Sequence, residues 1–478
     1  MNKISTTEQV QRSLKKRYRA EKRFRMYGVT SIVIGLLALL LLFTEIISKG
    51  VGAFKQHYVS LEINFDADDL GLDADLFTFF DAVREDYGNK LHSELKIADQ
   101  HATMAEALSE FEAQAQRDFG MTVIDALQAR EQQLADANFT GIIRNSLRER
   151  FPSVKSRRDR RALYSLVSVG ASFDLRDRVN ADASLIGTTQ KLWLLADDDL
   201  DTYVKSLNDS EPFIGRLKEN QVEFISSWLE KNEIDARFNT IFFTSGDSSE
   251  PEQAGILGAV MGTFFTLLVT LILSFPVGVA AAIYLEEYAT KNKFTDFIEV
   301  NINNLAAVPS VIFGLLGLAI FLNFFGMTRS VPLVGGMVLT LMTLPTIIIS
   351  SRAAITSVPP SIREAALGMG ASRMQTILHH VLPLAMPGML TGAIIGMARA
   401  LGETAPLLMI GMVAFIAEVP SSWNDAATVL PVQIYLWADS PERAFVERTS
   451  AAIMVLLAFL IMMNGLAIYL RKRLERRW

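Results

Sequence analysis

Arg399 and Glu403 are ionisable residues within one of the most apolar stretches of this 478-residue chain. Because they are four residues apart, they share one face of a helix. A charged side chain in the hydrocarbon layer of a bilayer costs roughly 3 kcal/mol on insertion scales. A chain that keeps such a pair directs it toward a protein partner or a water-filled path. An arginine in such a path can bind an oxyanion through its planar fork of donors.

The role of this pair has two interpretations. In the first, Arg399 and Glu403 neutralise each other inside a helical bundle. In the second, Arg399 faces a translocation path and binds a passing anion, while Glu403 adjusts its position. Arg352 is a further candidate for the path, although an arginine at the cytoplasmic end of a membrane helix is also an ordinary anchor.

Other kinds of site find no support in the sequence. The chain has no cysteine and five histidines. No HExxH or comparable ligand spacing occurs, so we predict neither a metal site nor a cofactor. A GxxxxGKS or GxxxxGKT motif is also absent, so the chain does not bind ATP through a P-loop. We therefore expect a protein that is not an enzyme and that has no ATPase site of its own.

A polar segment, residues 352–383, separates two apolar runs. Pro360 follows another proline, which imposes an extended step and presets the start of a helix. Ser361 is a candidate N-cap, with Glu364 at the third helical position. Gly370 permits a sharp turn or a helix end. The segment is therefore predicted to form short helices at the membrane face, or simply a capped loop helix.

This segment resembles the cytoplasmic coupling motif of ABC importer permeases. The family pattern is Glu-Ala-Ala, a glycine four residues after the second alanine, and Ile-x-Leu-Pro further on. His380 stands where the pattern has isoleucine. The resemblance implies that an ATPase subunit docks on the matching residues, which are Glu364, Ala365, Ala366, Gly370, Leu382 and Pro383.

Two further stretches resemble the phosphate-specific permease of the PstA type. They are ARALGETAPLL at 398–408 and NLAAVPSVIFGLLGL at 304–318. The resemblance covers about the last half of the chain. It implies a membrane permease subunit of an ABC importer for inorganic phosphate. Sulfate and molybdate are alternative substrates, because one arginine does not choose between oxyanions.

The same resemblance implies a set of partners. They are a second permease subunit (a copy or a different chain), a dimer of ATP-binding subunits, an external phosphate-binding protein and the lipid bilayer. A signalling receptor with an external sensor domain is a less favoured alternative, because no signalling domain follows residue 285. A membrane-embedded enzyme using Glu403, His379 or His380 lacks a nucleophile–base or metal constellation. No nucleic-acid partner is expected.

The apolar runs that must position these residues are long. Half of the residues are hydrophobic and 21% are charged, which fits a membrane bundle with one sizeable polar domain. At 1.5 Å per residue, six runs can cross a bilayer. We therefore predict an α-helical polytopic membrane protein with an ABC importer permease-like bundle and an inserted α+β extracytoplasmic domain. The six predicted spans are 29–47, 255–285, 300–325, 331–350, 384–416 and 450–470.

The distribution of basic residues predicts the orientation. Residues 1–28 carry nine Lys and Arg and residues 471–478 carry five, whereas the loops 326–331 and 418–448 together carry three. The positive-inside rule therefore places both termini in the cytoplasm, and the resemblance implies the cytoplasmic (inner) membrane of a bacterium. A cleavable signal peptide is the alternative for 29–47, but the run is long and lacks a small-x-small cleavage site.

The largest polar region, residues 48–252, contains no spanning run and carries 23 basic against 37 acidic residues. We expect it to form one external α+β domain. The domain boundaries are thus a basic segment 1–28, a first span 29–47, the external domain 48–252 and a permease core 253–478. Within the external domain we predict helices at 101–135, 198–207 and 220–231 and strands at 163–169, 190–195 and 241–244.

Overall fold

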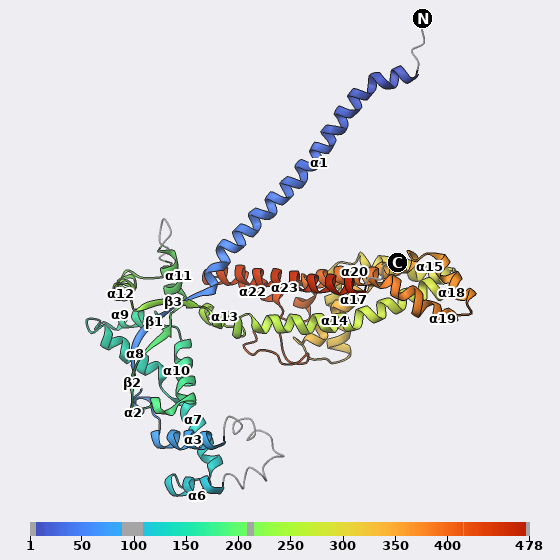
Figure 1. Cartoon of the computed structure of the whole chain (residues 1–478). Helices are drawn as coiled ribbons and strands as arrows, with labels where there is room; N and C mark the ends of the chain where they lie inside the picture. Colours follow the sequence, from blue (N-terminus) through green and yellow to red (C-terminus); the bar gives the residue numbers. More distant parts are fainter. Residues whose placement is uncertain (1–5, 88–108, 208–214, 414, 475–478) are drawn as a thin grey trace. The chain divides into compact units, whose positions relative to one another are not determined.

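The structure is a computed structural model of the whole chain and describes residues 6–87, 109–207, 215–413 and 415–474. The chain divides into two compact units (Figure 1). The first combines Met1–Ala53 with Ile256–Trp478, and the second is Phe54–Gly255. The outermost basic residues at both ends and the predicted helix between 101 and 108 lie outside the described residues.

The described part of the first unit consists of helices and the loops that connect them, with no strand. Three of its elements, η5, η6 and η7, are π-helical turns that continue or precede longer helices. The elements are α1 (Thr6–Gly50), η1 (Val51–Phe54), α14 (Leu257–Ile283), η5 (Tyr284–Tyr288), α15 (Lys293–Ala306), α16 (Ser310–Gly317), η6 (Leu318–Phe324), α17 (Pro332–Thr356), α18 (Pro360–Gly368), α19 (Arg373–Thr376), η7 (Ile377–Val381), α20 (Leu382–Leu401), α21 (Ala405–Met409), α22 (Leu430–Ala438) and α23 (Ala444–Leu474).

Among the described residues, five helices are long and apolar enough to cross a membrane, and a sixth span results if one bent pair is counted as a single crossing. The bent pair is α15 with η6 and α16, which meet at 102°. The span predicted at 300–325 is therefore two helices that meet at a sharp bend, not one continuous helix. The physical reason is Pro309, which has no N–H to donate and disfavours a helical conformation for Val308 before it.

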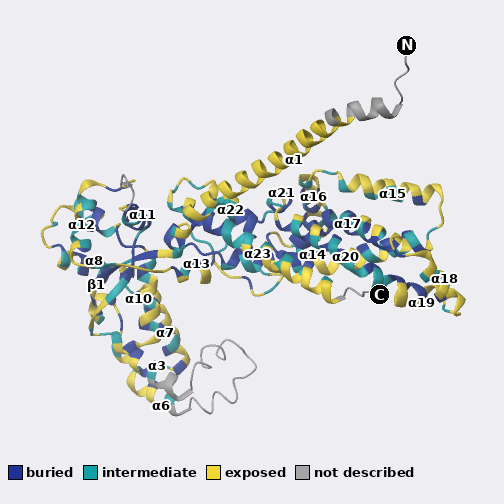
Figure 2. Ribbon diagram, turned by 45° about the horizontal axis from the view of Figure 1, so that its top comes forward, coloured by how far each residue is buried: buried dark blue, intermediate teal, exposed yellow. Residues whose placement is uncertain are grey.

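Close backbone approach holds the centre of the first unit together. Figure 2 shows its buried residues along α14, α17 and α20, whereas α15 is exposed. Gly388 and Gly392 of α20 face α17: a Cβ on Gly388 would lie 2.6 Å from the Ala354 Cβ, and one on Gly392 would overlap Ser350. These contacts give the two glycines a packing role, since small residues let membrane helices approach closely.

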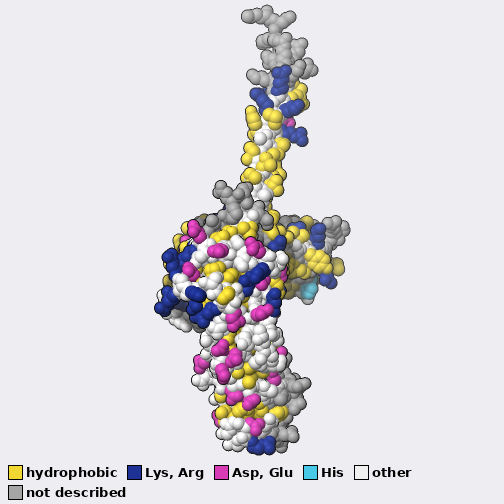
Figure 3. All heavy atoms as spheres, turned by 90° about the vertical axis from the view of Figure 1, so that its left-hand side faces the viewer, with side chains coloured by type: hydrophobic (Ala, Val, Ile, Leu, Met, Phe, Trp, Pro, Cys, Tyr) yellow, Lys and Arg dark blue, Asp and Glu magenta, His cyan; other side chains and the backbone are white. Residues whose placement is uncertain are grey.

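Helix α1 contains residues 6–28 of the predicted basic segment and the whole predicted first span. Figure 3 shows its Lys and Arg side chains followed by a band of hydrophobic side chains. The apolar part is exposed along its length, as expected of a helix surrounded by lipid tails. At its C-terminal end, a Cβ on Gly50 would lie 2.7 Å from the Met454 Sδ of α23. The two helices therefore pack at that end.

The last third of the unit departs from the predicted spans in two places. The span expected at 384–416 ends at Leu401, where Gly402 caps α20, and only the short α21 follows. The loop expected at 418–448 contains α22, which is buried at Gln433 and Trp437. Gly402 and Pro406 explain the early end, because both residue types interrupt helices.

The second unit has a three-stranded antiparallel sheet with strand order β2–β1–β3. Helices pack around it. Its elements are β1 (Lys55–Asn64), α2 (Ala67–Leu70), α3 (Ala74–Tyr87), α6 (Ser109–Asp118), α7 (Val123–Asp136), α8 (Phe139–Arg150), α9 (Arg157–Tyr164), α10 (Gly170–Ala181), η3 (Ala183–Leu185), β2 (Thr189–Leu195), α11 (Asp198–Ser206), α12 (Glu219–Glu230), β3 (Ile234–Phe238), α13 (Thr240–Thr244) and η4 (Pro251–Gln253).

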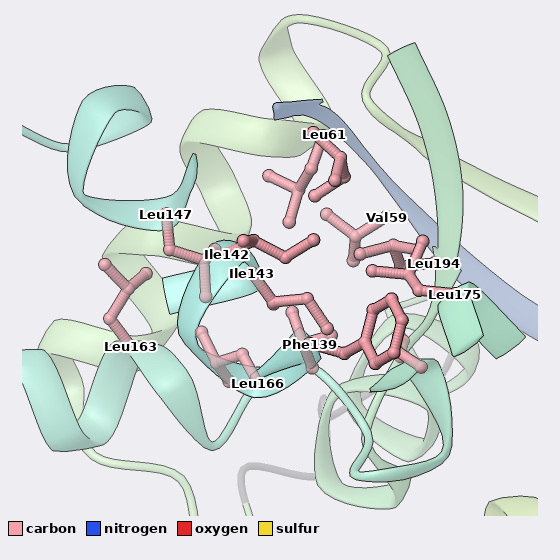
Figure 4. Packing of buried hydrophobic residues seen from close by; sticks show 14 of the residues in the cluster. Val59, Leu61, Phe139, Ile142, Ile143, Leu147, Leu163, Leu166, Leu175 and Leu194 are labelled. Atoms are coloured by element: carbon pink, nitrogen blue, oxygen red, sulfur yellow. The ribbon is translucent and has the colours of Figure 1, made fainter. Parts of the chain in front are cut away.

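A large hydrophobic core lies between the sheet and its helices (Figure 4), and a separate cluster joins α3, α6 and α7. Val59 and Leu61 of β1 point from the sheet toward Ile142 and Ile143 of α8, as the alternation of a strand requires. Trp228 of α12 is fully buried in the same cluster. The unit therefore has the independent core expected of a domain.

Several predicted elements of this unit are wrong. Residues 163–169 contain one isolated bridge, between Val167 and Ala196, and no strand. Residues 241–244 form helix α13. The helix predicted at 101–135 is divided into α6 and α7, with Gly120 at φ +67° between them. The strand predicted at 190–195 and the helices at 198–207 and 220–231 are confirmed as β2, α11 and α12.

Candidate functional site

The predicted coupling segment, residues 352–383, begins in the last turns of α17. Pro359 is extended, with ψ 137°, and α18 starts at Pro360 without a side-chain cap. Ser361 therefore does not cap this helix, and Glu364 does not complete a capping box. The reason is that Pro360 already occupies the first helical position, so Ser361 lies inside the helix. Within the described residues Glu364 is exposed and unpaired, so it remains available to a protein partner.

Gly370 forms the turn between α18 and α19. Its φ is +88°, and its N–H donates to the Leu367 carbonyl at 2.9 Å. This positive φ favours glycine, because a residue with a Cβ is strained there even though nothing lies within 4 Å of the Cβ position. The turn presents apolar side chains outward: Leu367 is 50% exposed and Met369 is 90% exposed. Such exposed apolar groups mark an interaction surface.

Arg363 lies behind this surface and holds α18 to the bundle. Its Nε and Nη2 donate to Glu287 Oε1 of η5 at 3.0 and 2.8 Å. Its Nη1 donates to the Val358 carbonyl at 2.7 Å, and its Nη2 donates to the Ile355 carbonyl at 2.9 Å. The carboxylate is largely buried, with 10% of its side chain exposed. One guanidinium thus joins three segments of the chain.

Arg352 makes a second clamp beside the first. Its Nε donates to Glu286 Oε1 at 2.6 Å, and its Nη2 donates to Glu299 Oε1 at 2.8 Å. This arginine therefore connects the end of α17 to η5 and α15. Its two carboxylate partners occupy the donors that a substrate anion would need, so this arrangement favours the anchor interpretation of Arg352 over a position in the path.

Arg399 and Glu403 are brought together, as their spacing predicts. Arg399 lies in the last turn of α20, and its Nε is 3.5 Å from Glu403 Oε1. The exposed fractions of the two side chains differ: 48% for Arg399 and 19% for Glu403. Among the described residues, Glu403 is the one carboxylate within ion-pair distance of the Arg399 guanidinium. At 3.5 Å the contact is loose, and most of the guanidinium donors remain free.

The two candidate path arginines lie at different levels of the bundle. Gly388 faces Ala354 and Gly392 faces Ser350, so Arg352 is level with the segment between those glycines. Arg399 lies roughly nine residues further along α20, or about 13 Å at 1.5 Å per residue. The arginines therefore do not form a single binding site.

The second unit contains a buried carboxyl pair that sequence reasoning did not identify. The Ser168 hydroxyl donates to Glu252 Oε1. Burial raises the pKa of Glu252 to about 7. Burial, followed by the charges of Asp198 and Glu252, raises the pKa of Asp197 to about 8. No pattern in the sequence marks these two carboxyls, because Glu252 lies in a linker and Asp197 precedes an ordinary helix.

Arg363, Glu286 and Glu287 were also not identified from the sequence. The only available signal is the pair of adjacent glutamates in the sequence YLEEY, at the end of a predicted span. Acidic groups at such a position require basic partners if they are to be buried. The sequence does not say which arginine supplies them.

Residues 274–477 match the family model described as "Binding-protein-dependent transport system inner membrane component". Residues 11–212 match "Domain of unknown function (DUF3333)". The first match covers most of the first unit after α1, including the coupling segment and Arg399. The second covers α1 and much of the second unit.

Several curated proteins are similar to the core. "Probable ABC transporter permease protein YqgH" of Bacillus subtilis is 31% identical over 54% of this chain and 82% of that protein. "Phosphate transport system permease protein PstA 1" of Mycobacterium tuberculosis is 30% identical over 48% and 73%. "Phosphate transport system permease protein PstA" of Haemophilus influenzae is 32% identical over 42% and 69%.

Among solved structures, a chain of the MetNI methionine ABC transporter in an inward-facing conformation is similar at 19% identity and a TM-score of 0.38. The match covers 46% of this chain and 95% of that chain. A chain from a bacterial alginate ABC transporter in complex with a periplasmic protein matches at 17% identity and a TM-score of 0.36, over 46% and 78%.

Proposed function

The chain belongs to the family of ABC transporter permeases related to PstA, and from this premise we propose that it is the membrane permease subunit of an importer for inorganic phosphate. The likeness to several PstA proteins supports this substrate. The observation that carries the proposal is the environment of Arg399.

Arg399 has one loose ion-pair partner and a half-exposed guanidinium on a helix that is apolar enough to span a membrane. Lipid tails would leave its free donors unsatisfied at high cost. Water or a protein surface therefore covers this face in the working transporter. Free arginine donors facing water suit an oxyanion such as phosphate, because they can bind two of its oxygens at once.

The exposed position of Arg399 also supports a path shared between two subunits. This chain forms half of the path, and a second permease subunit forms the other half. A dimer of ATP-binding subunits docks on α18 and the turn at Gly370, where Leu367 and Met369 are exposed. An external binding protein delivers phosphate.

The orientation follows from the same proposal. Both termini and the coupling segment lie in the cytoplasm, and residues 54–255 lie outside the cytoplasmic membrane. The external position fits a unit with its own hydrophobic core and no membrane-spanning helix among its described residues. A protease added outside right-side-out vesicles should cleave this unit and leave α18 intact.

The substrate is tested in proteoliposomes that contain this chain, a second permease and the ATPase. The binding protein is supplied on the side of the membrane that carries residues 54–255. ATP-dependent accumulation of labelled phosphate, in preference to sulfate and molybdate, supports the proposal. Arg399→Gln should abolish uptake, while Arg473→Gln, an exposed arginine at the end of α23, should not. Preference for sulfate or molybdate would overturn the substrate assignment.

A further inference from the structure

Helix α18 is attached to the bundle by few side chains. Ala366 is its one buried residue, and Ile362 and Arg363 are half-buried. The remaining residues of the helix are exposed. A partner that pushes on the exposed face would therefore move α18 alone, unless a strong contact ties it to the spanning helices.

The connection between α17 and α18 is weak along the backbone. Pro359 and Pro360 have no N–H, so the hydrogen-bond ladder of α17 cannot continue across them. The Ile355 carbonyl would find the nitrogen of Pro359 at its ordinary helical donor position, and it accepts from the Val358 N–H at 3.2 Å instead. Arg363 adds side-chain donors from the far side of the proline step, because its Nη2 donates to the Ile355 carbonyl and its Nη1 donates to the Val358 carbonyl.

The same guanidinium continues to a third segment. Its Nε and Nη2 bind Glu287 of η5, which directly continues α14. Beside it, Arg352 binds Glu286, the preceding residue of η5. Two successive glutamates are thus held by two arginines, one on each side of the proline step. This arrangement makes the ends of α14, α17 and α18 one connected group.

We propose that Arg363 is the positioning residue that makes the coupling helix move as one body with the ends of α14 and α17, so that displacement of α18 by the ATPase reaches the spanning helices. The inference rests on the proposed function, because it assumes that the ATPase docks on α18. Arg363 does not touch the substrate or the nucleotide. Lysine cannot replace it fully, because one ammonium cannot reach a carboxylate and two carbonyls in the same geometry.

The first arm of the test measures movement and does not depend on the transported substrate. The chain has no cysteine, so Ser361→Cys on α18 and Tyr284→Cys on η5 can carry two spin labels before assembly with the other subunits. Both positions are exposed. Pulsed EPR should give one narrow distance distribution, unchanged between the nucleotide-free and ATP-trapped complex. With Arg363→Gln the distribution should broaden or shift on trapping.

The second arm measures coupling in the same complex. Arg363→Gln should leave the ATPase bound, while phosphate transported per ATP falls at least about fivefold, the lower end of measured coupling between sites. For Arg363→Lys, phosphate transported per ATP should lie between the values for the wild type and Arg363→Gln. Lys293→Gln, an exposed cation at the start of α15, is the control and should match the wild type.

The outcomes are distinct. If Arg363→Gln does not assemble, Glu287→Gln replaces it in both measurements. This variant keeps the two carbonyl contacts of Arg363, so the EPR distance distribution should broaden less and phosphate transported per ATP should fall less. A narrow, unshifted distribution together with wild-type transport per ATP would overturn the proposal. If the wild type hydrolyses ATP but imports no phosphate, the substrate assignment fails, while the EPR arm still tests Arg363.

Discussion

Gly392 of α20 packs against Ser350 of α17 so closely that a Cβ on the glycine would overlap the serine side chain. This contact fixes the register of the two helices. Through that register it sets the level of Arg399 relative to Arg352. The glycine is therefore needed for helix contact, and its φ is not in the left-handed region.

Gly392→Ala should lower the thermal stability of the purified protein in detergent, because the added methyl group must push α17 and α20 apart. Gly465→Ala in α23 is the matched control. Nothing lies within 4 Å of its Cβ position, so it should be neutral or slightly stabilising. Adding Ser350→Gly to Gly392→Ala should restore part of the loss. Equal melting temperatures for the two single variants would contradict this packing.

Gly370→Ala should weaken coupling through backbone strain alone. A left-handed conformation costs a residue with a Cβ roughly 1–2 kcal/mol, so the turn should shift and displace Met369. Gly368→Ala is the control, because it too has open space around its Cβ position but lies at ordinary φ. Phosphate transport and co-purification of the ATPase are the measurements. Transport should fall in Gly370→Ala only, and an equal loss in Gly368→Ala would contradict the role of backbone strain.

The second unit should fold alone when it is expressed as residues 54–255. A fragment that stops at residue 248 should be less stable, because Glu252 and Ala254 are buried in the unit and the Gly255 N–H donates to the Gly246 carbonyl at 2.7 Å. Circular dichroism melting of the two fragments measures the difference. Identical melting curves would mean that the linker adds nothing to this domain.

The stability of that fragment should fall as pH rises from about 5 to 8. The pKa of Glu252 is raised to about 7 and that of Asp197 to about 8, so in this range the folded state binds more protons than the unfolded state. Stability then falls with pH, by up to about 1.4 kcal/mol per pH unit for each proton. Glu252→Gln should reduce the slope, whereas Glu223→Gln on the exposed face of α12 should not. A stability that rises over this range would contradict the assignment.

The sequence predicted an element well where one physical requirement acts on every residue of a continuous run, as in the membrane-spanning helices. Hydrocarbon contact requires about 20 apolar residues, and this predicted α14, α17 and α23 closely. The third span was less predictable. Pro309 marks a break, but the bend of 102° depends on what α16 packs against, including the contact between Gly314 and Pro406.

Strand β1 was missed because it follows the spanning helix after only one short turn, η1. Its alternating apolar residues, Val59, Leu61 and Ile63, indicate a strand only once the end of α1 is known. The contact between Arg363 and Glu287 could not be predicted either, because the partners are 76 residues apart. Local patterns indicate that a charge needs a partner, but only the packing of α14 and α18 selects which one.

The role of Arg399 is tested most directly by phosphate uptake through the double variant Arg399→Gln/Glu403→Gln. Arg399→Gln alone leaves Glu403 without its cation and should reduce folded protein. The double variant removes both charges and should restore normal protein levels. Arg399→Lys should transport partly, because a point charge lacks the bidentate fork. If Arg399 binds phosphate, the double variant is present in the membrane at wild-type level and does not transport. Near-normal uptake by that variant would show that the pair serves only to neutralise itself, and would contradict the account.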